Sequence, residues 1–170
     1  MKFFKAFVIV LLAMAAILTM ITVFVPEVDG HAEVMIEKPV ISVYAGMLNT
    51  GTMTEWVNGL DSIEREDGFL AMPGSKFRLH YKGRETHTVQ TLEVLEIVPL
   101  RSIKFKLYDE MVEMTITMDF ESVDGGTKVE SYLQMKGKGY MSRAFLPLLR
   151  SVILEEGREN LAAFKQLQEK

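Results

Sequence analysis

The chain of 170 residues contains no cysteine, and this absence removes several kinds of chemistry. Without a thiol there is no cysteine nucleophile, no disulfide and no thiolate-bound metal. The redox compartment stays open, because a chain without thiols is compatible with either environment. Basic residues are also fewer than acidic ones, 19 against 23. This balance argues against a nucleic-acid-binding domain.

Motifs that carry catalysis or metal binding are equally scarce. The three histidines, His31, His80 and His87, show no metal-ligand spacing such as H-E-x-x-H. We therefore expect structural or surface roles for them and no metal site. No nucleophile with a base and an orienting partner stands out, and there is no phosphate-binding glycine loop. The sequence thus predicts neither a catalytic group nor a cofactor.

One long apolar run is present at the start of the chain. Residues 6–25 are uncharged, and their only polar members are Thr19 and Thr22. At about 1.5 Å per residue, a helix of this length spans roughly 30 Å, the thickness of the hydrocarbon core of a bilayer. Lys2 and Lys5 precede the run and acidic residues follow it. The positive-inside rule then predicts a single-pass membrane protein with a cytoplasmic N-terminus and an extracytoplasmic domain, periplasmic in a Gram-negative cell.

Two other interpretations of this segment are a cleaved signal peptide and a buried core helix. A cleaved signal peptide shares the basic start and the apolar run, and residues 28–30 form a passable cleavage site, but signal apolar regions usually stop at about 7 to 15 residues. A buried core helix is disfavoured because the run shows no amphipathic stripe. We therefore expect residues 1–25 to be a transmembrane signal anchor, residues 26–33 a linker and residues 34–170 one domain.

The domain is predicted to be α+β. Alternating apolar residues indicate a first strand over residues 32–38, followed by short helices over 39–48 and 52–57. Helical periodicity returns over 140–170, where Pro147 separates a lead-in turn from the main helix. Between these parts, six segments with strand periodicity are punctuated by turn residues and predict an antiparallel meander over 60–66, 75–82, 86–98, 101–108, 111–123 and 127–136.

This order of elements resembles the helix-grip fold of the START/Bet v 1-like (SRPBCC) superfamily, in particular the bacterial polyketide cyclase/dehydrase and lipid-transport group. The resemblance covers residues 32–170. It is carried by Thr-Glu-Trp-Val at 54–57, Gly74, Val-Leu-Glu-Ile-Val-Pro at 94–99, Asp-Gly-Gly-Thr-Lys-Val at 124–129 and the closing helix over 161–169. It implies a curved sheet around a long C-terminal helix, with an apolar cavity between them that accepts a hydrophobic ligand.

The residues give independent signs of such a cavity. Three of the 12 methionines, Met114, Met118 and Met135, fall on the predicted inner face, and methionine suits walls that accept varied shapes. In the C-terminal helix, Leu149, Ile153 and Gly157 fall on one apolar stripe, while charged residues such as Glu155 and Glu156 lie largely away from it. Gly157 removes side-chain volume from this inner stripe. The alternative is that these residues simply fill a core. With the resemblance, we expect a ligand pocket lined by Trp56, Phe77, Leu79, Tyr81, Phe105, Met114, Ile116, Met118, Ser131, Leu133, Met135, Leu149, Ile153 and Gly157.

Three functions follow as hypotheses. The leading one is membrane-anchored binding or transfer of a lipid or other hydrophobic small molecule. The second is a cyclase/dehydrase-like enzyme in which Tyr81 or Ser131 supplies hydrogen bonds. The third is an accessory subunit of a membrane complex, with a protein partner. Two basic clusters, around residues 136–143 and on the strand over 76–84, either touch lipid headgroups or form solvated surface.

Overall fold

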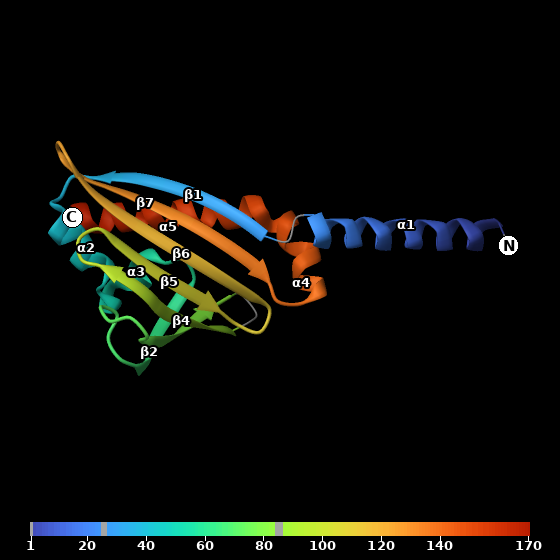
Figure 1. Ribbon diagram of the computed structural model, residues 1–170, viewed down its shortest axis with the longest axis horizontal. Helices are drawn as coiled ribbons and strands as arrows, with labels where there is room; N and C mark the ends of the chain where they lie inside the picture. Colours follow the sequence, from blue (N-terminus) through green and yellow to red (C-terminus); the bar gives the residue numbers. More distant parts are fainter. Residues whose placement is uncertain (1, 25–26, 84–86) are drawn as a thin grey trace.

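The computed structural model describes residues 2–24, 27–83 and 87–170 (Figure 1). Its helices and strands follow one another along the chain as α1 (Lys2–Phe24), β1 (Glu27–Ile36), α2 (Val40–Met47), the 3-10 turn η1 (Thr50–Thr52), α3 (Met53–Trp56), β2 (Leu60–Asp67), β3 (Lys76–Lys82), β4 (His87–Val98), β5 (Ser102–Tyr108), β6 (Val112–Val123), β7 (Gly126–Gly137), α4 (Tyr140–Phe145), the 3-10 turn η2 (Leu146–Leu149) and α5 (Arg150–Glu169).

The strands form one antiparallel sheet in the order β1-β7-β6-β5-β4-β3-β2. The meander β2 to β7 keeps chain order, and β1 joins it beside the last strand. Each meander strand agrees with its predicted range to within one residue at each end; Thr86, the predicted start of β4, lies outside the described residues. The helix α5 runs along the sheet (Figure 1). The predicted α+β architecture with a long C-terminal helix is thus confirmed, and it is consistent with a helix-grip fold.

The first strand corrects one boundary. We expected a linker over residues 26–33, but β1 begins at Glu27 and pairs with β7 from Glu27 opposite Lys136 to Ile36 opposite Thr127. The acidic residues that suggested a linker belong to an edge strand, on which charge is common. Gly30 has a packing role there, because a side chain at this position would collide with Leu154 of α5. The strand and the helix can therefore pack closely.

The C-terminal helix begins later than a continuous pattern over 140–170 suggests. Pro147 lies in η2, where the missing proline N–H is tolerated, and α5 starts only at Arg150. This interruption confirms the predicted lead-in. The residues before Arg150 therefore do not continue the helical face of α5, and this affects which of them can line a cavity beside that helix.

The main core closes the end of the sheet nearest α2 and α3. Phe164 of α5 is fully buried, and its ring lies 5.1 Å from that of Trp56. Tyr44 of α2 meets Phe120 of β6 edge to face at 5.4 Å. The buried hydroxyl of Thr127 donates a hydrogen bond of 2.8 Å to the carbonyl oxygen of Lys38, which fixes the loop after β1. This end of the domain is filled by side chains and leaves space elsewhere.

At the other end, α1 extends away from the domain (Figure 1). A hydrogen bond of 3.0 Å joins the hydroxyls of Thr19 and Tyr140 and links α1 to α4. Over residues 2–24, 27–83 and 87–170, none of the helices combines the length and apolar character that crossing a membrane requires. The predicted helix is therefore present, whereas the predicted membrane span is not shown. Residues 25 and 26, where the anchor was expected to end and the linker to begin, lie outside the described residues.

Candidate functional site

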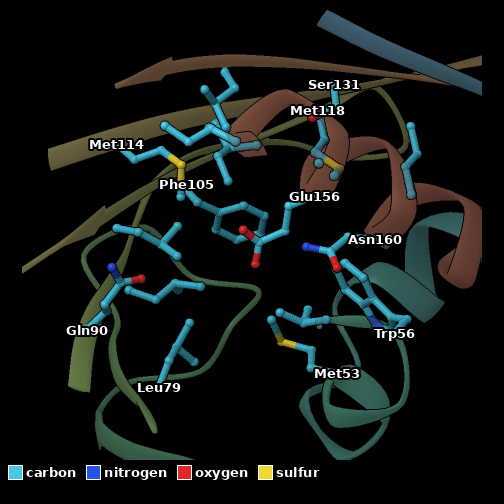
Figure 2. A pocket seen from close by; sticks show the side chains of 18 of the residues that line it. Met53, Trp56, Leu79, Gln90, Phe105, Met114, Met118, Ser131, Glu156 and Asn160 are labelled. Carbon is cyan, nitrogen blue, oxygen red and sulfur yellow. The ribbon is translucent and has the colours of Figure 1, made fainter. Parts of the chain in front are cut away.

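A cavity of about 360 Å³ lies between the sheet and α5, with α3 at one end (Figure 2). Its size falls within the range of about 300–1,000 Å³ that is typical of small-molecule sites. Strands β3 to β7 supply one wall through alternate residues, because side chains on a strand point to opposite faces in turn. Residues between Ile153 and Leu161 of α5 supply the opposite wall.

Most of the pocket residues predicted from the sequence line this cavity. The structure brings together Trp56, Leu79, Tyr81, Phe105, Met114, Ile116, Met118, Ser131, Leu133, Met135, Ile153 and Gly157. Their role in ligand binding stays a prediction. At Gly157, no atom other than those of its two chain neighbours and of the backbone of α5 lies within 4 Å of the point where its Cβ would be. Open space therefore adjoins the helix at this residue.

Two predicted residues are elsewhere. Phe77 is buried in the core at the start of β3, beyond the closed end of the cavity, whereas Leu79 and Tyr81 farther along the strand line the cavity. Leu149 lies in η2 and is 52% exposed. We had placed it on the same helical stripe as Ile153, but the change of phase at Pro147 turns it away. The cavity therefore ends before each of these two residues.

Sequence reasoning missed part of the wall. The additional lining residues are Met47, Met53, Val57, Thr88, Gln90, Leu92, Leu107, Glu156, Asn160 and Leu161. Leu92 and Leu107 follow the strand alternation and Leu161 follows the helical spacing, so the sequence patterns could have predicted all three as lining residues. Glu156 lines the cavity, which corrects our expectation that it lies with the charged residues that face away from the apolar stripe. Its spacing of four residues from Asn160, beside Ile153 and Gly157, is the signal that both side chains share one helical face.

Glu156 and Asn160 bring polar groups into an otherwise apolar space. Figure 2 shows both side chains pointing from α5 into the cavity, with the amide nitrogen of Asn160 on the side of Glu156. The amide oxygen of Asn160 is engaged elsewhere, since it accepts a hydrogen bond of 2.8 Å from the backbone N–H of Asn58. Within the described part of the chain, the carboxyl group of Glu156 has neither a hydrogen bond nor an ion pair.

The electrostatics of the cavity follow from this carboxyl group. Burial raises the pKa of Glu156, and the neighbouring charge of Glu159 raises it further. Burial also raises the pKa of Tyr81 to about 12, with a smaller contribution from the charge of Glu156. No lysine, arginine or histidine is among the described residues that line the cavity. An ionised Glu156 therefore makes the cavity electronegative.

Outside the cavity, the register of β1 and β7 gathers possible metal ligands that their sequence spacing did not indicate. Ligand atoms of His31, Glu33 and Glu130 lie within 4.8 Å of one another on the surface. Lys128 Nζ already lies 3.1 Å from Glu130 Oε1 and 3.5 Å from Glu33 Oε2. The positive charge of Lys128 thus balances one of the two carboxylates, and a cation would have to displace it.

The two basic clusters are largely paired within the domain. Lys136 Nζ lies 2.8 Å from Glu27 Oε1, and Arg78 forms an ion pair with Glu66. Arg143 Nε donates a hydrogen bond of 3.1 Å to a backbone carbonyl oxygen, that of Gly137. Arg84, counted in the second cluster, lies outside the described residues. These pairs favour a structural role over a headgroup site.

Comparison with solved structures identifies the same fold in proteins of low sequence identity. The Zhui aromatase/cyclase from Streptomyces sp. R1128 aligns with a TM-score of 0.69 and 14% identity over 84% of this chain and 94% of its own. Ara h 8.0201 aligns with a TM-score of 0.68 and 12% identity over 84% and 97%. The di-domain aromatase/cyclase StfQ of the steffimycin pathway aligns with a TM-score of 0.67 and 14% identity over 84% and 51%.

At the level of sequence, none of the curated proteins matches the chain. A family model does match, over residues 38–143, from the loop before α2 to α4. This range includes five strands and the helix α3 that bound the cavity. The sequence match and the structural neighbours agree on the superfamily that the sequence resembled. The chain therefore belongs to the Activator of Hsp90 ATPase homolog 1-like family, within the START/Bet v 1-like (SRPBCC) superfamily.

Proposed function

We propose that this domain binds a hydrophobic small molecule, such as a lipid, in the cavity between α5 and the sheet. The observation that carries the proposal is the cavity itself, which a chain of this size would otherwise fill with side chains. Transfer of apolar ligand surface from water contributes about 25 cal/mol per Å² before the costs of association. The structural neighbours named as aromatase/cyclases support the same kind of site.

The composition of the wall supports a ligand of adaptable shape. Five methionines line the cavity: Met47, Met53, Met114, Met118 and Met135. Their unbranched side chains change rotamer at little cost and make polarisable contacts. Met114 and Met135 lie directly opposite each other on β6 and β7, at the end of the sheet from which the chain continues into α4. A ligand that enters from this end meets a flexible wall first.

We further propose that the domain is held at a membrane through α1. The apolar side chains of this helix are exposed, for example Ile9 at 66% and Leu12 at 65%. A second exposed apolar group lies beside the helix, on α4, η2 and the start of α5, and consists of Tyr140, Met141, Phe145, Leu148, Leu149 and Val152. Exposed apolar patches of this kind mark surfaces that bind partners or lipid. The arrangement would place the Met114 end of the cavity near a lipophilic source.

The membrane proposal is tested by charge introduced into α1. In the double variant Ile9→Lys, Leu12→Lys, we expect the chain to move from the membrane pellet to the supernatant after cell lysis. Met72, an exposed residue of the domain at 53%, supplies the matched control as Met72→Lys. Equal sedimentation of all three proteins would contradict the proposal. The side of the membrane on which the domain lies stays a prediction from the flanking charges, and protease accessibility in spheroplasts tests it.

The cavity proposal is tested by mass spectrometry of small molecules that copurify with the full chain. We expect a hydrophobic compound that is depleted when the cavity is filled by the substitution Gly157→Leu. A cavity that is empty after purification and takes up no hydrophobic probe would contradict binding. Stoichiometric copurification of a protein in mild detergent would instead support the third hypothesis, an accessory subunit of a membrane complex.

An enzyme of the aromatase/cyclase kind is a second candidate. It is favoured by the presence of Tyr81 and Glu156 in one cavity, where a phenol and a carboxyl group with a raised pKa can bind and orient a reactive carbonyl compound. Turnover of a poly-β-ketone substrate that falls in both Tyr81→Phe and Glu156→Gln would support it. Binding without turnover would leave the carrier as the better description.

A further inference from the structure

We propose that the ligand carries a hydrogen-bond-donating polar end, a cationic amine or a neutral hydroxyl, which is held by Glu156, and that the cavity rejects anionic amphiphiles. This inference rests on the proposed function, because it specifies what kind of hydrophobic molecule the cavity accepts. It begins from the position of Glu156 on the wall formed by α5, with its carboxyl group directed inward (Figure 2).

The carboxyl group is unusual because nothing in the wall neutralises it. The other polar lining residues, Tyr81, Thr88, Gln90, Ser131 and Asn160, are uncharged at neutral pH, and across the described residues of the wall there is no basic side chain. The nearby charge that acts on Glu156 is that of Glu159 on the same helix, which is also negative. The side chain of Glu156 is partly exposed at the open cavity, and burial of the rest disfavours its charged form. A ligand that supplies a positive charge or a hydrogen-bond donor therefore adds an interaction that no residue of the wall provides.

Space for such a group exists beside the carboxyl group. The next residue, Gly157, has no side chain, and apart from its two chain neighbours and the backbone of α5, no atom lies within 4 Å of the position that its Cβ would take. The ligand's end group can therefore approach the helix next to Glu156, while its apolar part lies against Phe105 and the methionines of the sheet.

Asn160 completes a site for one end of a ligand. Its amide oxygen is held by the backbone N–H of Asn58, and this bond directs the amide NH₂ group into the cavity (Figure 2). A hydroxyl group placed here can donate to Glu156 and accept from Asn160, and an amine can donate to Glu156 with charge assistance. A carboxylate has no proton to donate and would meet a like charge. The expected order of affinity is therefore amine, then alcohol, then carboxylate.

The single tryptophan provides a direct readout, because Trp56 lines the cavity. Three probes with the same alkyl chain, n-decylamine, n-decanol and n-decanoate, are titrated at pH 8 into the full chain while the fluorescence of Trp56 is recorded. All variants are measured in the same detergent, so that partition of each probe cancels when variants are compared. We expect the ratio of the decylamine affinity to the decanoate affinity to be at least about tenfold larger in the wild type than in Glu156→Gln, with a smaller change in the ratio for decanol and decanoate.

The substitution Glu156→Gln removes the charge and keeps the shape. In this variant we expect the affinities for decylamine and decanoate to converge, through weaker binding of decylamine and tighter binding of decanoate. Glu155→Gln is the matched control, since Glu155 lies on the same helix, outside the cavity and paired with Arg158, and it should keep the wild-type order. The same ratio of decylamine to decanoate affinity in the wild type and in Glu156→Gln would overturn this inference alone. The absence of any fluorescence change with every probe would overturn the proposed function as well.

Discussion

Glu156 on α5 and Tyr81 on β3 face one cavity from opposite walls, and the charge of the carboxylate adds to the effect of burial in keeping the phenol protonated. Burial is the larger cause, and together they raise the pKa of Tyr81 to about 12. The two residues are 75 positions apart in the sequence. Their interaction therefore exists only in the folded state, and it has consequences for stability as well as for binding.

The first prediction concerns alkaline pH. The pKa of Tyr81 is about 12 in the folded state and 10.0 as its ordinary value, so the folded state holds the proton more tightly. The stability from this group is complete below pH 10 and is lost as the pH rises toward 12, by about 2 to 3 kcal/mol. In Tyr81→Phe, the free energy of unfolding should fall less between pH 9 and pH 12 than in the wild type. Denaturant unfolding at several pH values measures this difference. Parallel pH profiles of the free energy of unfolding in the two proteins would show that folding does not raise the pKa of Tyr81.

The second prediction concerns the cost of Glu156. Because burial raises the pKa of this group above its ordinary 4.5, the folded state favours the protonated form. The corresponding stability is present below the unfolded pKa and is lost as the pH rises through the folded pKa. Glu156→Gln should therefore be more stable than the wild type at pH 8, and the difference should vanish near pH 4. Thermal unfolding of both proteins at pH 8 and pH 4 checks this difference in stability. The control Glu155→Gln should show no gain at pH 8. A loss of stability at pH 8 in Glu156→Gln would contradict the prediction.

The third prediction uses the space at Gly157. Leucine at this position should enter the cavity without a clash, because nothing lies within 4 Å of the Cβ position. We expect Gly157→Leu to weaken the binding of a neutral dye, N-phenylnaphthylamine, by at least about tenfold, a loss typical of a filled apolar pocket. The control Gly157→Ala should bind almost normally and gain about 0.5–1 kcal/mol of stability, since glycine is unfavourable within a helix. Unchanged dye binding in Gly157→Leu would show that the ligand does not use this region.

The fourth prediction concerns the buried hydroxyl of Thr127. Its bond to the carbonyl oxygen of Lys38 joins the last strand to the loop after β1. Thr127→Val keeps the shape but leaves that carbonyl without its donor, so the free energy of unfolding should fall by about 1–3 kcal/mol. Thr127→Ser keeps the hydroxyl and should lose clearly less. Urea unfolding of the three proteins gives the comparison, and a loss in Thr127→Ser as large as that in Thr127→Val would contradict the prediction.

Much of the fold is present in local patterns. Alternation of apolar residues located the strands of the meander, and helical spacing together with Pro147 located α5, because these elements are dictated by which face of each segment must be buried. The same alternation placed nine strand residues at the cavity, and helical spacing placed Ile153 and Gly157 there. The limits of the cavity were not local: Phe77 has the periodicity of a lining residue but lies beyond the point where α3 and α5 close the core.

The sequence by itself determined the order of elements, the inner face of the sheet, the long apolar helix at the start and the lack of thiol chemistry. Only the tertiary structure decided that Glu156 faces inward, that Leu149 faces outward and that His31 meets Glu130. The physical reason is that periodicity specifies which side of one element is apolar, whereas a cavity and its charges depend on how two elements pack. A glutamate beside an apolar stripe can face either solvent or a cavity, and only the position of the opposing sheet decides between them.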